Sequence, residues 1–144
     1  MAVLKVAGRK AGLMPANAED LFTVEKLLCD AADLQGCSFK AVTMFGAPRE
    51  AQQNFKNVDI PTHVGNIERQ LGGNNWFVGN KLSLADVAIY TVLTVNCRNQ
   101  VADCLNAFPK LAAFCARFEA LPAIKKYHAE PRFTNLMRFG PLDP

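Results

Sequence analysis

Apolar residues recur along the chain at intervals of three and four, the spacing of one face of an α-helix. Behind an acidic first turn, six apolar residues follow this spacing from Asn17 onwards: Leu21, Val24, Leu27, Leu28, Ala31 and Ala32. The alternation of apolar and polar residues that marks strands is almost absent. The pattern predicts an all-α protein with a long helix that starts near residue 17 and continues, with a break near Gly36 or Gly46, through the segment REAQQNFKNV.

Glycine and proline mark the ends of the other expected helices. A short helix is predicted over residues 2–12, where Gly12 supplies a C-terminal stop. Pro61 suits the first turn of a new helix, which ends at Gly72 and Gly73. Later helices are expected from Ser83 to about residue 101, over the segment PKLAAFCARFEAL and from Pro122. The sequence contains no internal repeat and no low-complexity tract.

The segment NKLSLADVAIY places Ser83 three residues ahead of Asp86, at the start of an apolar run. This is the spacing of a capping box, in which each side chain bonds the backbone N–H of the other residue. Catalysis by Ser83 would need a nearby histidine, and nothing in the sequence places His63 or His128 beside it. We therefore interpret Ser83 and Asp86 as a structural N-cap inside the domain, where loss of Ser83 would cost about 1 to 2 kcal/mol.

Composition and charge narrow the classes of function. The 144 residues, half of them apolar, suffice for one domain with a core, and the net charge is +3. Basic residues are scattered among acidic ones, which gives little support for nucleic-acid binding. No apolar run is long enough to cross a bilayer, and residues 1–15 do not read as a signal peptide. We expect a cytoplasmic protein that binds neither nucleic acid nor membrane.

The five cysteines include no C-x-x-C pair and have no histidine at metal-binding spacing, so no metal site is predicted. They are expected to be reduced and mostly buried, with Cys97 and Cys104 on one helix face. Both histidines are expected to be exposed on helices. Trp76 and Phe77 are expected to anchor a loop to the core.

Several motifs carry a family resemblance. The segments WFVGNKLSLADVAIY and FPKLAAFCARFEALPAIKKY resemble the C-terminal helical domain of cytosolic glutathione transferases. CLNAFPKLAAF, EPRFTNL and VDIPTHVGNIERQLGG are similar to the pi, mu and sigma branch of that family. The resemblance covers essentially the whole chain and implies an all-α helical bundle of the glutathione transferase type.

In that family a thioredoxin-like domain precedes the helical domain. The segment AVLKVAGRKAGL resembles the end of its last helix, so residues 1–14 are interpreted as its remnant and residues 15–144 as the helical domain. The glutathione site and the Tyr, Ser or Cys that stabilises the glutathione thiolate would lie before residue 1. Tyr90 and Tyr127 cannot take that role by position. The resemblance implies no catalytic residue in this chain and no cofactor, with glutathione as co-substrate of the parent family.

The resemblance to the glutathione transferase family implies functional roles for three residues of this chain. Asp33 matches the carboxylate that reaches across the dimer to the α-amino group of the partner's glutathione, whereas the alternative is a solvated carboxylate near Lys26 or Lys40. Phe39 and Thr43 match positions that face the pocket for the hydrophobic electrophile. The alternative for these two is that Phe39 belongs to the core and Thr43 to the helix surface.

Three functions remain open from the sequence. The chain is a truncated or natural helical half of a glutathione transferase, inactive by itself; a stand-alone interaction module; or a carrier of hydrophobic small molecules. A homodimer is expected, and a hydrophobic small molecule is the other partner considered. The helix over residues 2–12 is expected to pack back on the domain, to swap between chains or to fray.

Overall fold

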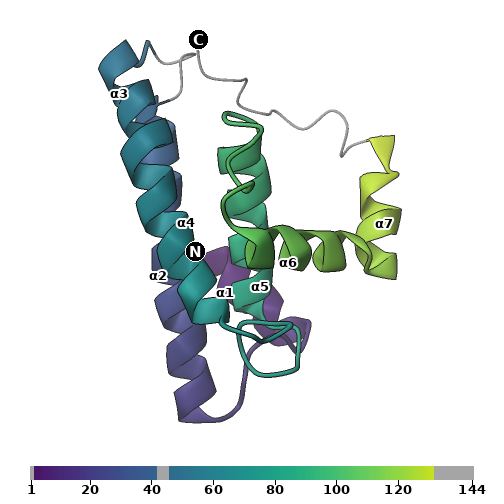
Figure 1. The fold of residues 1–144 in the computed structure, drawn as a ribbon. Helices are drawn as coiled ribbons and strands as arrows, with labels where there is room; N and C mark the ends of the chain where they lie inside the picture. The colour runs from purple at the N-terminus through teal and green to yellow at the C-terminus, as the bar shows by residue number, and fades with distance from the viewer. Residues whose placement is uncertain (1, 42–45, 132–144) are drawn as a thin grey trace.

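A computed structural model of the protein describes residues 2–41 and 46–131 (Figure 1). Within these ranges the chain is helical and has no strand, the nearest approach to one being an isolated bridge between Val78 and Lys81. The prediction of an all-α protein is therefore confirmed.

Helix α2 (Ala18–Ala41) is the longest element and forms the axis of the fold. A helix break was predicted near Gly36 or Gly46. Gly36 lies inside α2 and does not break it, so the first position is wrong. Gly46 follows residues 42–45, which lie outside the described ranges. The helix contacts α3, η2, α4, α5 and η3, which together enclose its buried face. Seven residues of α2 are buried: Val24, Leu27, Leu28, Ala31, Leu34, Ser38 and Ala41.

The second long rod consists of three segments, α3 (Arg49–Asn54), η2 (Phe55–Asp59) and α4 (Ile60–Leu71), which follow one another without a break (Figure 1). The prediction that Pro61 lies in the first turn of a helix holds for α4, but the residues before it are also helical, since Asp59 and Ile60 both have αR backbone angles. Segment η2 is a π-helix, a wider turn that suits a position where proline cannot donate to the helical ladder.

The C-terminal half of the described chain contains α5 (Leu84–Thr91), its π-helical continuation η3 (Val92–Arg98), α6 (Pro109–Glu119) and α7 (Pro122–His128). The helix predicted to run to residue 101 ends at Arg98. Cys104 therefore lies in the turns that follow and not on a helix face with Cys97, although both are buried as predicted. In Figure 1, α6 runs across from this bundle and carries α7 at its far end.

Helix α1 (Ala2–Lys10) packs back on the domain. The Leu84 N–H donates to the Leu13 carbonyl at 2.9 Å, and a side chain at Gly8 would come within 2.8 Å of a Leu84 methyl group. Lys5 also forms an ion pair with Glu25 of α2. The apolar stripe of α1 nevertheless faces outward, since Val3 is 84% and Val6 51% exposed.

A buried capping box starts α5. Asp86 is fully buried and Ser83 is 3% exposed, and both reciprocal contacts of the box are present. The Asp86 Oδ2 atom accepts from the Ser83 N–H at 2.7 Å and from the Ser83 hydroxyl at 2.8 Å. The Oδ1 atom accepts from the Phe77 N–H at 2.9 Å. One carboxylate therefore holds the helix start and the preceding loop together.

Burial raises the pKa of Asp86, and the hydrogen bonds from Phe77 and Ser83 partly offset this shift because they favour the ionised carboxylate. The aromatic anchors of the loop lie beside the box. Phe77 packs edge-on against Phe114 with 5.2 Å between ring centroids, and Trp76 does so at 6.0 Å. Phe77 is buried and Trp76 packs against the core as predicted.

A second buried polar group joins α2 to the end of η3. The Ser38 hydroxyl accepts from Asn96 Nδ2 at 3.2 Å and from Gln100 Nε2 at 2.6 Å, and all three residues are at most 4% exposed. Three specific donors and acceptors inside the core fix the register of α2 against η3.

The cysteines differ in access to solvent. Cys29 is exposed, Cys37 is half-buried, and Cys97, Cys104 and Cys115 are buried; all five are free thiols. Burial raises the pKa of Cys104 to about 11 and that of Cys115 to about 12, and it raises the pKa of Cys97 as well. These three behave as small core side chains.

Because its capping box is buried, the N-cap of α5 should contribute more to the free energy of unfolding than the exposed N-cap of α2. Ser83→Ala should lower the free energy of unfolding by about 1 to 2 kcal/mol, because it removes buried hydrogen bonds. Asn17→Ala is the matched control, since the Asn17 side chain accepts from the Asp20 N–H at 2.8 Å on the surface, and should cost about 0.5 to 1 kcal/mol. Urea unfolding measures both. Equal costs would show that burial of the box adds nothing.

The burial of the thiols predicts their order of alkylation. With iodoacetamide at pH 7, Cys29 should react first, Cys37 more slowly, and the three buried cysteines only when the protein unfolds. Mass spectrometry of peptides taken at successive times measures each site, and urea-unfolded protein gives the unprotected rates. Rapid labelling of Cys97 or Cys115 in the folded protein would contradict this packing.

Candidate functional site

The outer surface of α2 carries two of the three residues predicted to serve a transferase site. Asp33 is exposed, and Phe39 is 43% exposed, so Phe39 is not a core residue. Thr43 lies outside the described residues. Asp33 and Phe39 are six residues apart, which places them roughly 120° apart around the helix. They lie on neighbouring sides of α2 and do not face one point.

A different set of side chains converges between α2 and the second long rod of the fold, which runs through α3, η2 and α4. Cys37 of α2, Asp59 of η2 and His63 of α4 are all half-buried, and one ligand atom from each lies within 4.8 Å of the others. Cys37 Sγ is 3.9 Å from His63 Nε2. The sequence did not predict this cluster, because 26 residues separate Cys37 from His63. The one local signal is the four-residue spacing of Asp59 and His63 on a helix.

The environment of Cys37 does not activate it as a nucleophile. Burial is the main factor that raises the pKa of its thiol, and the negative charges of Asp59 and Asp33 raise it further, while Lys40 acts in the opposite direction. A nucleophilic cysteine needs a lowered pKa. The cluster is therefore better suited to holding a positive charge than to attacking an electrophile.

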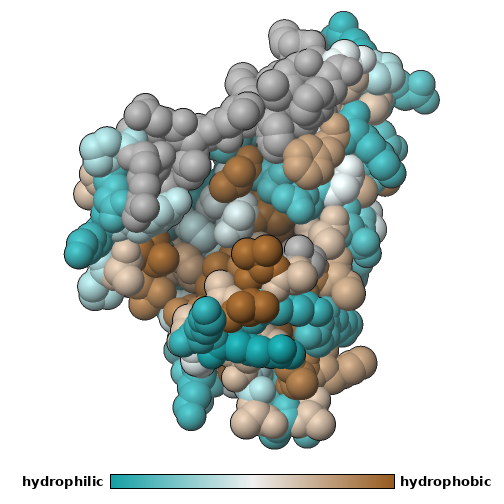
Figure 2. All heavy atoms as spheres, turned by 180° about the vertical axis from the view of Figure 1, so that it is seen from behind, coloured by the Kyte–Doolittle hydropathy of each residue, from teal (hydrophilic) through white to brown (hydrophobic). Residues whose placement is uncertain are grey.

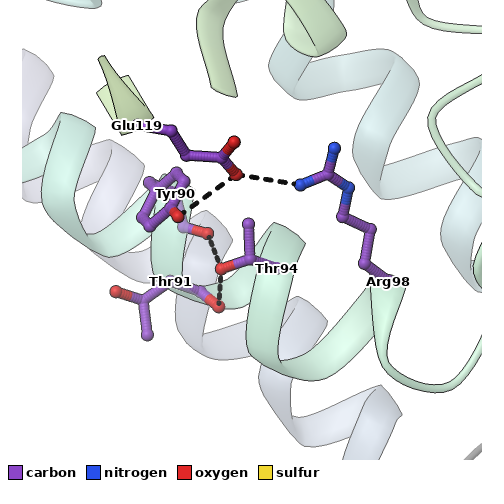
Figure 3. Close-up of polar contacts among 5 residues, drawn as sticks. All are labelled: Tyr90, Thr91, Thr94, Arg98 and Glu119. Atoms are coloured by element: carbon purple, nitrogen blue, oxygen red, sulfur yellow. Dashed lines mark hydrogen bonds and ion pairs between the residues drawn. The ribbon is translucent and has the colours of Figure 1, made fainter. Parts of the chain in front are cut away.

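Glu119 of α6 links α6 to the helix formed by α5 and η3 (Figure 3). Its Oε1 atom accepts from the Tyr90 hydroxyl at 3.3 Å and from Arg98 Nη1 at 3.0 Å. The Tyr90 ring also stacks on Phe118 with 4.2 Å between centroids. Burial and the charge of Glu119 raise the pKa of Tyr90, so its hydroxyl stays protonated and donates to Glu119. This arrangement fixes α6 in place and explains Tyr90 as a structural residue.

The two histidines are half-buried, contrary to the prediction that both are exposed. His63 faces the Cys37 thiol, and the ring of His128 lies parallel to Tyr90 with 6.4 Å between centroids. Tyr127 is 38% exposed on α7, in agreement with its predicted place on a late surface helix.

None of the described helices combines the length and the apolar composition needed to cross a membrane. The hydrophobic side chains that reach the surface are instead scattered over several elements, and some gather in the middle of the face seen from behind (Figure 2). The most exposed are Val3, with 84% of its surface accessible, and Phe22, with 71%.

Comparison with known proteins gives a matching family and similar sequences. The family described as glutathione S-transferase, C-terminal domain, matches residues 37–131. Glutathione S-transferase Mu 1 of Oryctolagus cuniculus is 32% identical over 139 residues, which are 96% of this chain and 62% of that protein. Glutathione S-transferase Mu 4 of Homo sapiens is 39% identical over 132 residues, or 92% of this chain and 59% of that protein.

Solved structures share the fold at lower sequence identity. The Pi-class glutathione S-transferase of Onchocerca volvulus superimposes with a TM-score of 0.80 at 23% identity, over 94% of this chain and 65% of that one. Prostaglandin synthase D of Nilaparvata lugens gives 0.78 at 18% identity, over 88% and 64%.

The chain spans about three-fifths of the length of the curated relatives it matches. The match to the family extends over most of the chain, from the last turns of α2 to the residues after α7. By this match and the helical fold, the chain belongs to the glutathione S-transferase C-terminal domain family.

Proposed function

We propose that the chain is the helical half of a glutathione transferase that conjugates glutathione to hydrophobic electrophiles. The observation that carries this proposal is the match of residues 37–131 to the transferase helical domain. The exposure of Phe39 and Asp33 on α2 supports it, because side chains that serve a ligand must be accessible. In this proposal residues 1–14 end a thioredoxin-like domain and residues 15–144 form the helical domain.

Each candidate residue has a role in the proposed parent activity. Phe39 and Thr43 form one wall of the electrophile pocket. Asp33 binds the α-amino group of glutathione held by the other subunit of a homodimer, and an exposed carboxylate can form a charge-assisted hydrogen bond to an ammonium group. A homodimer and a hydrophobic small molecule are therefore the proposed partners, and the free thiols suit a cytoplasmic location.

The isolated chain is proposed to be inactive. Conjugation requires the glutathione thiol to be ionised, which needs a hydrogen-bond donor directed at its sulfur. The Tyr90 hydroxyl already donates to Glu119, and the thiols of Cys97, Cys104 and Cys115 are buried. These described groups are therefore unsuited to activating a bound thiol.

A second candidate is an interaction module. The exposure of Val3 and Val6 on α1 favours it, because an apolar helix face without cover is suited to protein contact. The same face would be covered if a thioredoxin-like domain lay beside α1. The first candidate predicts activity when such a domain is supplied, whereas the second does not.

A chimera tests the parent activity. The isolated chain should show no heat with glutathione by isothermal titration and no conjugation of an aromatic electrophile. Fusing the thioredoxin-like domain of a Mu-type transferase ahead of residue 15 should restore turnover, because that domain supplies the glutathione site and the thiol-activating donor. Turnover by the isolated chain would contradict its proposed inactivity, and a folded, dimeric but inactive chimera would favour the interaction module.

The role of Asp33 is tested in the same chimera. Asp33→Asn should raise KM for glutathione about tenfold with a smaller effect on kcat, because it removes one charged hydrogen bond to the bound tripeptide. Glu19→Gln, which neutralises another exposed carboxylate of α2, should leave KM unchanged. Equal effects of the two substitutions would assign Asp33 to the solvated surface.

A further inference from the structure

Three side chains of metal-binding types converge between α2 and the neighbouring rod. Cys37 belongs to α2, Asp59 is the last residue of η2, and His63 lies in the first turns of α4. Their ligand atoms lie within 4.8 Å of one another, and no other group of three or more histidine, cysteine or acidic side chains in the described ranges meets this condition. The cluster includes neither Asp33 nor Phe39, the described residues proposed for the transferase site.

The distances suit a first-row metal ion. A zinc ion binds thiolate sulfur at about 2.3 Å and imidazole nitrogen at about 2.0 to 2.1 Å, which places the two atoms roughly 3.6 Å apart in a tetrahedron. The observed separation of Cys37 Sγ and His63 Nε2 is 3.9 Å. A movement of a few tenths of an ångström would bring these atoms to ligand distance. Rotation of the Asp59 carboxylate can bring in the third ligand, because its terminal torsion is soft.

Regular backbone elements position all three residues. Asp59 and His63 are four residues apart along one helical rod, so they lie on the same side of it. That rod packs against α2 through both η2 and α4, which brings this side toward Cys37. The π-helical turn of η2 ends at Asp59 and sets the angular position of its side chain. Such turns occur often at functional sites.

A neighbouring amide orients the carboxylate. Asn54 Nδ2 donates to Asp59 Oδ2 at 3.0 Å. Metal-binding carboxylates are commonly held in this way by a residue outside the ligand set, and each carboxylate has capacity for further interactions. Asp59 can therefore keep its bond to Asn54 and still offer an oxygen to an ion beside Cys37 and His63.

We propose that Cys37, Asp59 and His63 bind one zinc-like divalent ion. Sulfur and imidazole ligands select zinc and its neighbours over magnesium and calcium, which prefer oxygen. On binding, the Cys37 thiol releases its proton to solvent and its sulfur forms the bond to the metal. Three protein ligands leave a fourth position for water. The ion joins α2 to the rod that runs through η2 and α4.

Direct titration tests the site. Zn²⁺ alone and Co²⁺ alone are added to the reduced, purified chain in the presence of a phosphine reductant. One equivalent should bind, the midpoint of thermal unfolding should rise because the ion binds the folded state, and bound Co²⁺ should show a thiolate-to-metal charge-transfer absorption. The absence of stoichiometric binding would overturn the proposal.

Substitutions of the three proposed ligands can be compared with substitutions of the same residue types elsewhere in the chain. Cys37→Ser should abolish the charge-transfer absorption, and Asp59→Asn and His63→Gln should each weaken Co²⁺ binding at least tenfold. Cys29→Ser and His128→Gln replace the same residue types elsewhere and should leave binding unchanged. Circular dichroism confirms that each variant is folded. Absorption that persists in Cys37→Ser, or undiminished affinity in both Asp59→Asn and His63→Gln, would place the ion elsewhere and overturn the proposal.

Discussion

The buried carboxylate of Asp86 is the interaction on which the rest of the structure depends. A fully buried charge is tolerated only where several donors replace its water, and here the donors are the Ser83 N–H, the Ser83 hydroxyl and the Phe77 N–H. Because the donors come from both sides of a tight loop, the bonds fix that loop and the start of α5 at once. The loop in turn places the Trp76 and Phe77 rings against Phe114 of α6.

The sides of α2 divide into one that is buried in the core and others that face solvent or the neighbouring rod. Helix α5 and its continuation η3 pack against the buried side of α2, where Ser38 meets Asn96 and Gln100. The other sides of α2 are left to present Asp33 and Phe39 to solvent and Cys37 to the neighbouring rod. One helix thus carries both the proposed transferase contacts and the proposed metal ligand, and Cys37 follows Asp33 by four residues on the same side of α2.

Much of the fold could be predicted from the sequence because its signals are local. The apolar spacing identified α2, and the pair Ser83 and Asp86 identified the start of α5. The bond from the Phe77 N–H to Asp86 could not be predicted, because a backbone donor in a loop leaves no residue pattern. Gly36 was a poor guide to a helix break, because glycine is tolerated inside a helix that tertiary contacts support.

The candidate sites were harder to predict from the sequence than the fold. Whether Cys37 meets His63 depends on how two long helices are rotated against each other, and the π-helical turn of η2 changes that rotation without a clear signal in the sequence. The same contact explains why His63 is half-buried and not exposed as predicted. Asp33, Phe39 and Thr43 were identified by family resemblance alone, and their roles remain proposals.

Native-state hydrogen exchange tests the central place of Asp86 most directly. The amides of Phe77 and Ser83 lie in or beside a loop, where exchange is ordinarily fast, but both donate to the buried carboxylate. If that carboxylate holds the fold together, both amides should exchange only by global unfolding, with the same opening free energy as the amide of Ile89 in the core of α5. Exchange of Phe77 and Ser83 through a local opening far less costly than that of Ile89 would contradict the account.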